Sequence, residues 1–172
     1  LNYSLVIFNM DIKVKKQFLL YKEYRLKCSI GKLGTAHSKK EGDLKTPKGV
    51  FKLGSLYYRK DRMKLPKCVI KKKAIKKNTG WCDDSRSKKY NREISFPFKY
   101  KAERLYRKDM IYNLLIVIKY NYTKTIKNKG SAIFLHLADK KYKPTKGCIA
   151  LAKKDFLKIL PLINRRTKIS IN

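Results

Sequence analysis

The sequence predicts a mostly β protein that folds as a single domain. Short runs rich in Tyr, Phe, Leu and Ile carry charged residues at a period close to two, which is typical of strands. Loops containing glycine separate these runs, and only one segment near the C-terminus has helical spacing. A chain of 172 residues fits one domain and is long enough to bury a hydrophobic core. We therefore expect one domain over residues 1–172, without repeats or linkers.

Strands and a long loop are expected in the first half of the chain. Apolar runs predict strands within residues 3–8, 17–30 and 50–58. Residues 31–49 contain four glycines and a proline, so they predict a long loop with turns. Residues 69–75 hold three consecutive lysines inside an apolar stretch, a pattern typical of an edge strand that lysine keeps soluble.

The second half is expected to supply the buried strands. Residues 78–91 are polar and predict a loop, while residues 102–106 suggest one helical turn. High apolar density predicts buried strands at residues 110–118 and 131–137, and a short apolar strand follows Cys148.

The main helix is expected over residues 153–163. Pro161 should end it near Leu160, because proline cannot donate a helical hydrogen bond. Residues 167–171 then predict a closing strand. The apolar positions with helical spacing are Phe156, Leu157, Leu160 and Ile163.

The chain is extremely basic, with a formal net charge of +33. Such a charge predicts attraction to polyanions: nucleic acid, anionic lipid surfaces or an acidic wall polymer. The alternative is that A/T-rich codon usage enriched lysine on a solvated surface. No apolar run is long enough to cross a bilayer, and the apolar patch at residues 5–8 lacks the features of a signal peptide.

The four cysteines, Cys28, Cys68, Cys82 and Cys148, do not have the spacing of metal ligands. With only two histidines in the chain, we expect no zinc site and no cofactor. Cys28 and Cys68 lie in apolar, strand-like settings and are expected to be buried. Cys82 is the only rival to Cys148 as a nucleophile, although packing beneath Trp81 is the favoured interpretation.

The stretch from Ile133 to Leu151 carries the chemistry. An apolar run delivers His136, a polar loop follows, and the loop ends at Gly147-Cys148. A thiol attacks a carbonyl as thiolate, and a histidine within hydrogen-bond reach can take its proton. Gly147 allows a tight turn, so that backbone N–H groups near Cys148 could face a developing oxyanion. The alternative is a structural histidine and a buried cysteine that merely packs.

This stretch resembles the signature of the L,D-transpeptidase (YkuD-like) catalytic domain, in which a histidine precedes a Ser/Thr-His-Gly-Cys motif. Thr145, Gly147 and Cys148 match the motif, and His136 matches the upstream histidine. Lys146 stands at the second histidine, and the arginine that commonly follows the cysteine is missing. The segment from residue 42 to 51 resembles the family's Thr-Pro-x-Gly segment, and Gly80-Trp81-Cys82-Asp83 with Tyr90-Asn91 resembles a short subgroup that lacks the second histidine.

The resemblance, strongest over about residues 30–160, implies a β-sandwich-like catalytic domain in which Cys148 acts as nucleophile and His136 as its base. It implies a transpeptidase that acts on peptidoglycan stem peptides in the periplasm or cell envelope; without a recognised signal peptide, the cytoplasm stays open. Gly147 and Thr145 would shape the oxyanion site. His37, Trp81, Tyr90 and Asn91 are candidates for the substrate rim.

Several alternatives stay open at this point. Water in place of an amine would make the enzyme an L,D-carboxypeptidase. A basic nucleic-acid-binding protein without catalysis is the competing class, although the chain has no recognised nucleic-acid-binding motif. A backbone carbonyl, Thr145 or Asp139 could orient His136.

Overall fold

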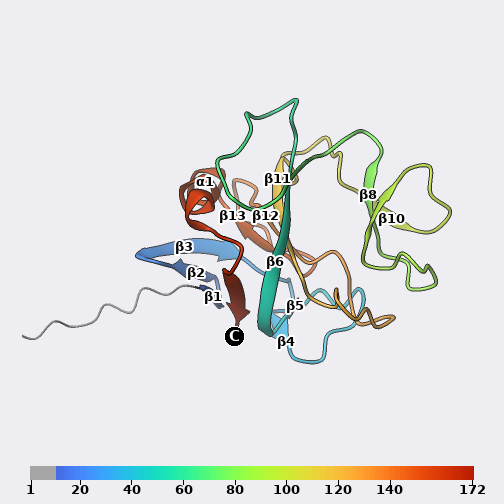
Figure 1. The fold of residues 1–172 in the computed structure, drawn as a ribbon. Coiled ribbons are helices and arrows are strands. Elements are labelled where there is room, and N and C mark those ends of the chain that lie inside the picture. The colour runs from blue at the N-terminus through green and yellow to red at the C-terminus, as the bar shows by residue number, and fades with distance from the viewer. Residues whose placement is uncertain (1–10) are drawn as a thin grey trace, which may run out of the picture.

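The structure, a computed structural model, describes residues 11–172 and is almost entirely β (Figure 1). The strand expected at residues 3–8 lies outside the described residues. The strands are β1 (Ile12–Lys15), β2 (Phe18–Tyr21), β3 (Tyr24–Ser29), β4 (Thr35–Ala36), β5 (Thr46–Pro47), β6 (Gly49–Tyr58), β7 (Lys72–Ala74), β8 (Thr79–Cys82), β9 (Glu93–Ser95), β10 (Ala102–Arg104), β11 (Leu114–Ile118), β12 (Phe134–Leu137), β13 (Ile149–Leu151) and β14 (Lys168–Ile171). The helices are α1 (Lys153–Ile159) and the 3-10 turn η1 (Leu160–Leu162).

The main sheet has nine strands in the order β11-β12-β13-β3-β2-β1-β14-β6-β7, and a further pairing of β11 with β6 closes it on itself. The closed sheet folds over an apolar core, which gives the β-sandwich-like architecture expected from the sequence. Side chains that point inward from alternate positions of these strands fill that core, as the period of two requires. Strand β11 is buried at every position.

The long strand β6 connects β14, near one end of the strand order, to β11 at the other end (Figure 1). Its first half pairs with β14, and its second half pairs with β11 on one side and β7 on the other. At Gly54 a Cβ atom would lie 3.0 Å from the Cβ of Val117, so glycine permits the close approach of β6 and β11 at this point. β7 pairs only with β6, so the prediction of a lysine-bearing edge strand is confirmed.

A second sheet, with strand order β10-β8-β9, covers the outer face of β6, β11 and β12. Two sequence predictions fail here. Residues 79–82 form the central strand of this sheet and are buried at every position, although residues 78–91 were expected to be a polar loop. Residues 102–104 form strand β10 and not a helical turn. Residues 79–82 form a strand in spite of their polar flanks, because β8 pairs with β9 on one edge and with β10 on the other.

A small outer core lies between the two sheets. Trp81 is 1% exposed and packs edge to face against Tyr57 and Phe134, with ring centroids 6.3 and 5.2 Å apart. The buried members of this outer core are Tyr57, Ile75, Trp81, Leu105, Tyr112, Leu115, Val117, Phe134 and Cys148. The outer core therefore places one of the four cysteines beneath a set of aromatic rings.

Helix α1 closes one end of the inner core beside β3 and β13 (Figure 1). It begins at Lys153, and η1, which contains Pro161, follows its last turn, as the sequence predicts. Phe156 and Ile159 are fully buried, whereas Leu157 points outward and is 38% exposed. The closing strand β14 was also predicted within one residue, while β1 and β9 were not predicted.

Phe156 is expected to anchor α1 to the inner core. Phe156→Ala should lower the free energy of unfolding by about 3–5 kcal/mol, because it removes a buried ring and leaves a cavity. Leu157→Ala, one position away on the exposed side, should change it by less than about 0.5 kcal/mol. Urea denaturation of both variants measures the difference, and equal losses would contradict this packing.

Candidate active site

Strands β12 and β13 run parallel, and their register brings His136 and Cys148 to one face. Leu135 pairs with Ile149 and His136 with Ala150, so Cys148 lies one step before the paired residues, beside Phe134. Side chains alternate along a strand, so His136 and Cys148 both face the outer core while Leu135 and Ile149 face the inner core. Diagonal neighbours of this kind have Cβ atoms about 7–8 Å apart or less, within reach of an imidazole.

The Cys148 thiol is held by two backbone groups. Its Sγ donates to the carbonyl of Ala132 at 3.2 Å and accepts a bond from the Phe134 N–H at 3.4 Å. The residue is only 7% exposed. Burial, with the nearby Glu103 carboxyl second, raises the pKa of the thiol to about 12, although the Phe134 N–H and the Lys39 ammonium favour the thiolate. The resting sulfur is therefore a neutral thiol.

His136 is oriented by the chain itself. Its Nδ1 lies 2.8 Å from the carbonyl oxygen of Leu137, so Nδ1 carries the proton and Nε2 is the basic nitrogen. Burial lowers the pKa of the imidazole to about 4, so it is neutral at physiological pH. Of the three orienting groups left open by the sequence, the structure supplies a backbone carbonyl. Asp139 instead accepts the N–H groups of Lys141 and Lys143.

The loop before Cys148 is fixed by the Thr145 hydroxyl. This hydroxyl donates to the Cys148 carbonyl at 2.6 Å and accepts the Gly147 N–H at 3.1 Å. Gly147 has a φ of 141°, and a Cβ there would lie 2.9 Å from the Lys45 carbonyl oxygen, so only glycine fits without strain. Lys146, between them, is exposed and faces solvent.

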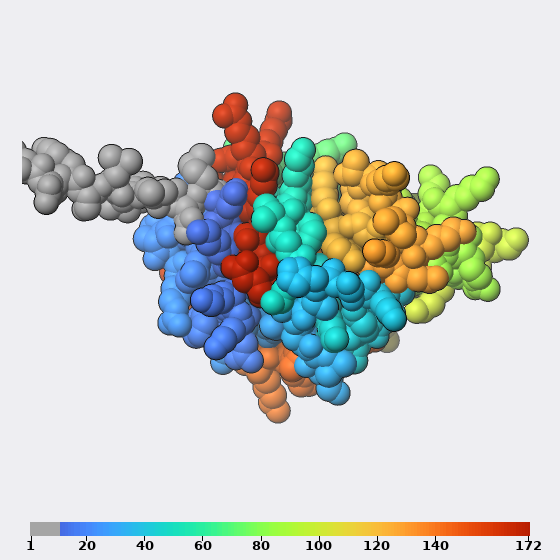
Figure 2. Space-filling view, turned by 90° about the horizontal axis from the view of Figure 1, so that it is seen from below, coloured from blue at the N-terminus to red at the C-terminus, as the bar shows by residue number. Residues whose placement is uncertain are grey.

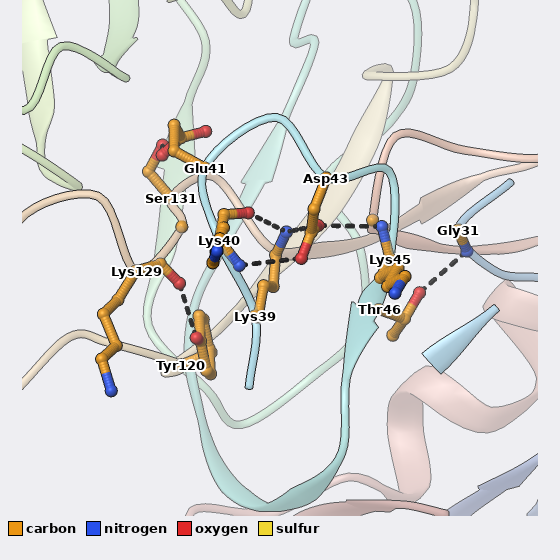
Figure 3. A network of polar contacts seen from close by, with 12 residues as sticks. Gly31, Lys39, Lys40, Glu41, Asp43, Lys45, Thr46, Tyr120, Lys129 and Ser131 are labelled. Atoms are coloured by element: carbon orange, nitrogen blue, oxygen red, sulfur yellow. Dashed lines mark hydrogen bonds and ion pairs between the residues drawn. The ribbon is translucent and has the colours of Figure 1, made fainter. Parts of the chain in front are cut away.

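A buried lysine lies on the other side of Gly147. Lys39 is 4% exposed, and its Nζ contacts Asp43 at 2.6 Å and the Lys40 carbonyl at 3.2 Å. Asp43 also accepts the backbone N–H groups of Lys40 and Lys45 (Figure 3). Burial alone would raise the pKa of Asp43, but these bonds hold it below its ordinary value. Lys39 thus brings a fixed positive charge close to the motif loop.

The loop that carries Lys39 is tied to the segment before β12. Glu41 accepts bonds from the Tyr90 and Ser131 hydroxyls, and its N–H donates to the Asn128 carbonyl. The two segments lie side by side on the surface, light blue beside orange in Figure 2. These bonds therefore hold the loop that carries Lys39 against the segment that leads into β12.

A polar cluster that the sequence did not reveal borders the thiol and the imidazole. The Tyr112 ring lies 5.3 Å from the His136 ring, and its hydroxyl donates to Glu103 at 2.9 Å. Burial raises the pKa of both Tyr112 and Glu103. Arg107 lies over the Tyr112 ring and 3.7 Å from Glu103. Tyr112 fell at the start of the predicted strand 110–118, but no local signal singled out Lys39 or Glu103 among so many charges.

Of the four residues proposed for a substrate rim, one is exposed and three are buried. His37 is exposed on the loop after β4. Tyr90 and Asn91 are 4% and 3% exposed, and their polar atoms bond Glu41, Trp81 and the backbone around Tyr120, so they support the loops and do not line a surface. Trp81 is buried in the outer core and donates its indole N–H to Asn91.

The other three cysteines lie apart from these groups. Cys28 and Cys82 are buried, at 1% and 0% exposed, and Cys68 is half-buried in a loop. All four cysteines are free thiols. Cys82 is thus enclosed beside Trp81 in β8, as the packing interpretation requires. Residues 11–172 contain no cluster of three or more His, Cys, Asp or Glu side chains suited to a metal ion.

The Lys39–Asp43 pair is expected to stabilise the loop beside Gly147. Lys39→Met should lower the free energy of unfolding by about 3 kcal/mol, because it leaves a largely buried carboxylate without its cation. Lys40→Met, which alters an exposed neighbour, should cost less than about 0.5 kcal/mol. Thermal and urea unfolding of the two variants tests this, and similar stability for both would show that the ion pair is not needed.

Comparison with known proteins agrees with this geometry. The model of the L,D-transpeptidase catalytic domain, YkuD, matches residues 10–171. Searches of curated proteins and of solved structures returned no match to the chain. None of the described helices is long and apolar enough to span a membrane. Because the family model covers nearly the whole sequence, the chain belongs to the L,D-transpeptidase catalytic domain family, whose enzymes use a cysteine nucleophile and act on peptidoglycan.

Proposed function

We propose that this chain is a cysteine acyltransferase that cross-links peptidoglycan stem peptides, with Cys148 as nucleophile and His136 as base. The observation that carries the proposal is the parallel register of β12 and β13. It brings the thiol and the imidazole to one face, and the Leu137 carbonyl leaves Nε2 of His136 as the nitrogen able to accept a proton.

The first half-reaction forms a thioester. As Sγ attacks the carbonyl carbon of the donor peptide, the thiol proton passes to Nε2 of His136. The carbonyl oxygen takes up the negative charge of the tetrahedral intermediate. When the C–N bond breaks, the imidazolium returns its proton to the leaving amine, and the acyl group remains on Cys148. The neutral resting pair means that charges form only while substrate is bound.

The second half-reaction releases the acyl group. An acceptor amine attacks the thioester and gives a proton to His136, the C–S bond breaks, and the thiol is restored with a new amide bond. Water as acceptor would give a free carboxylate and therefore carboxypeptidase activity. Backbone N–H groups near Gly147 and Cys148 are proposed to bind the oxyanion, which requires the Gly147 N–H to release the Thr145 hydroxyl.

The cell envelope is the proposed location, because peptidoglycan stem peptides are found there and the family acts on them. The competing function as a nucleic-acid-binding protein lacks a specific observation in its favour. The thiol and imidazole that the register places on one face support acyl chemistry over a binding role.

Cys148 is expected to be the residue that becomes acylated. A carbapenem, a β-lactam that reacts with thiols, should form one adduct on Cys148, and Cys148→Ala should abolish both the adduct and turnover. Cys82→Ser is the control and should keep both, because Cys82 is enclosed in β8. Mass spectrometry of the peptides locates the adduct. An adduct on Cys82, or full turnover by Cys148→Ala, would disprove the assignment.

His136 is expected to act as the base across neutral pH. Since burial lowers its pKa to about 4, wild-type acylation should stay nearly constant from pH 9 to about pH 5 and fall to about half near pH 4, where half of the imidazole is protonated. His136→Ala should lose roughly a hundredfold at pH 7. Its rate should then rise with pH, because hydroxide must remove a thiol proton whose pKa is about 12.

The chain's other histidine provides the control for this measurement. His37→Ala removes an exposed loop imidazole and should acylate at close to the wild-type rate throughout. Acylation rates are measured against pH for all three proteins, with circular dichroism to show that each is folded. A wild-type rate in His136→Ala at pH 7 would exclude His136 as the base.

A further inference from the structure

A basic groove lies on the same side of the main sheet as the thiol. It has a volume of about 700 Å³ and is bordered by β6, β7, β11, the segment around residues 88–93 and the turn before β14. Seven cationic side chains and a single carboxylate, Glu93, line it. Four of the cations are exposed: Lys71, Lys88, Lys89 and Arg165.

The positive charge of this basic groove is not neutralised within the chain. Glu93 is already engaged, since it pairs with Lys73 and accepts the Tyr57 hydroxyl. Within residues 11–172, the other six cations of the groove form no ion pair with a carboxylate. A groove with one sign of charge and a protein wall on several sides concentrates its field on an anion.

The aromatic rings beside the groove argue against nucleic acid as its occupant. Single-stranded nucleic acids bind through exposed rings on which bases stack. Here the Arg92 guanidinium lies 4.2 Å from the centroid of the Tyr122 ring, and Trp81 stacks on Tyr122 at 6.5 Å. The Tyr57 ring is 4% exposed and lies beside the Lys73 ammonium. The groove therefore offers charge without a platform for bases.

One row of paired residues connects the groove to the candidate base. Tyr57 of β6, which lines the groove, pairs with Leu115 of β11, and Leu115 pairs with His136 of β12. Neighbouring strands are about 4.8 Å apart, so the groove wall and the imidazole are separated by about 10 Å across one sheet face. A stem peptide bound in the groove would therefore lie about two strands from the candidate base.

We infer that the basic groove binds free carboxylates of a stem peptide next to the one that Cys148 attacks, and so holds the enzyme on the wall polymer. The inference rests on the proposed function for its choice of polymer. Stem peptides repeat along the wall and carry free carboxylates, and separately placed lysine and arginine side chains can pair with them in turn. The groove takes no part in bond making; it raises the local concentration of substrate.

The test compares two variants with the same net charge. The groove variant replaces Lys71, Lys88, Lys89 and Arg165 by Gln, and the control variant replaces Lys13, Lys15, Lys153 and Lys154, all exposed elsewhere, by Gln. Each loses four charges, from +33 to +29. Retention on isolated peptidoglycan sacculi is measured at fixed ionic strength, beside sacculi whose carboxylates have been converted to amides. Unfolding curves confirm that both variants are folded.

The groove variant should bind untreated sacculi at least tenfold more weakly, because several charge pairs with the polymer are lost together. The control variant should stay within about twofold of wild type, and amidated sacculi should retain wild type as weakly as untreated sacculi retain the groove variant. Equal weakening in both variants, or undiminished binding to amidated sacculi, would overturn the inference. So would a groove variant that loses only its affinity for single-stranded DNA.

Carbapenem acylation separates this inference from the proposed function. The groove variant should be acylated on Cys148 at the wild-type rate, because the small donor does not need the polymer site. Failure of wild type to be acylated would refute the proposed function alone. Normal acylation with unchanged sacculus binding in the groove variant would refute the groove alone.

Discussion

The parallel register between β12 and β13 is the constraint on which the rest of the structure depends. It puts Leu135 and Ile149 into the inner core while His136 and Cys148 face the outer core. A slip of one residue in either strand would turn a candidate catalytic side chain inward and an aliphatic one outward. The apolar residues beneath the site therefore do more than stabilise the domain, because their preference for burial fixes which side chains meet above them.

Covering this face with a second sheet has an electrostatic consequence. Under Trp81, Phe134 and Tyr112, both members of the pair lose the hydration that would stabilise their charged forms. The thiol and imidazole thus rest as a neutral pair, protected from the side reactions of a free thiolate. Lys39 is fixed close to the loop by Asp43, so a cation would already be present when negative charge develops in the proposed reaction. Because Lys39 is already in place, the proposed reaction would need little movement of charged groups.

The sequence predicted those parts of the fold that have a local signal. Apolar density predicted the buried strand at β11, helical spacing predicted the helix that ends just before Pro161, and a lysine run predicted the edge strand β7. Residues 79–82 could not be predicted as a central strand, because their own flanks are polar and only pairing with β9 and β10 reveals the strand. For the same reason the loop motif predicted Cys148 and His136 but not Lys39, Glu103 or Tyr112. These three residues reach the candidate site only through tertiary contacts.

Acidic and basic side chains have different roles in this chain. Of its 12 acidic residues, eight are in ion pairs within residues 11–172: Asp43, Asp61, Asp83, Asp84, Glu93, Glu103, Asp109 and Asp139. Others accept structural hydrogen bonds, as Glu41 does from Tyr90 and Asp11 from the Lys168 N–H. Carboxylates are thus committed to holding loops and strands, while most of the 45 cations remain available to outside partners. Drift in codon usage can account for the number of lysines. The position of the charges supports a functional role instead, because six of the unpaired cations surround one groove two strands from the candidate base.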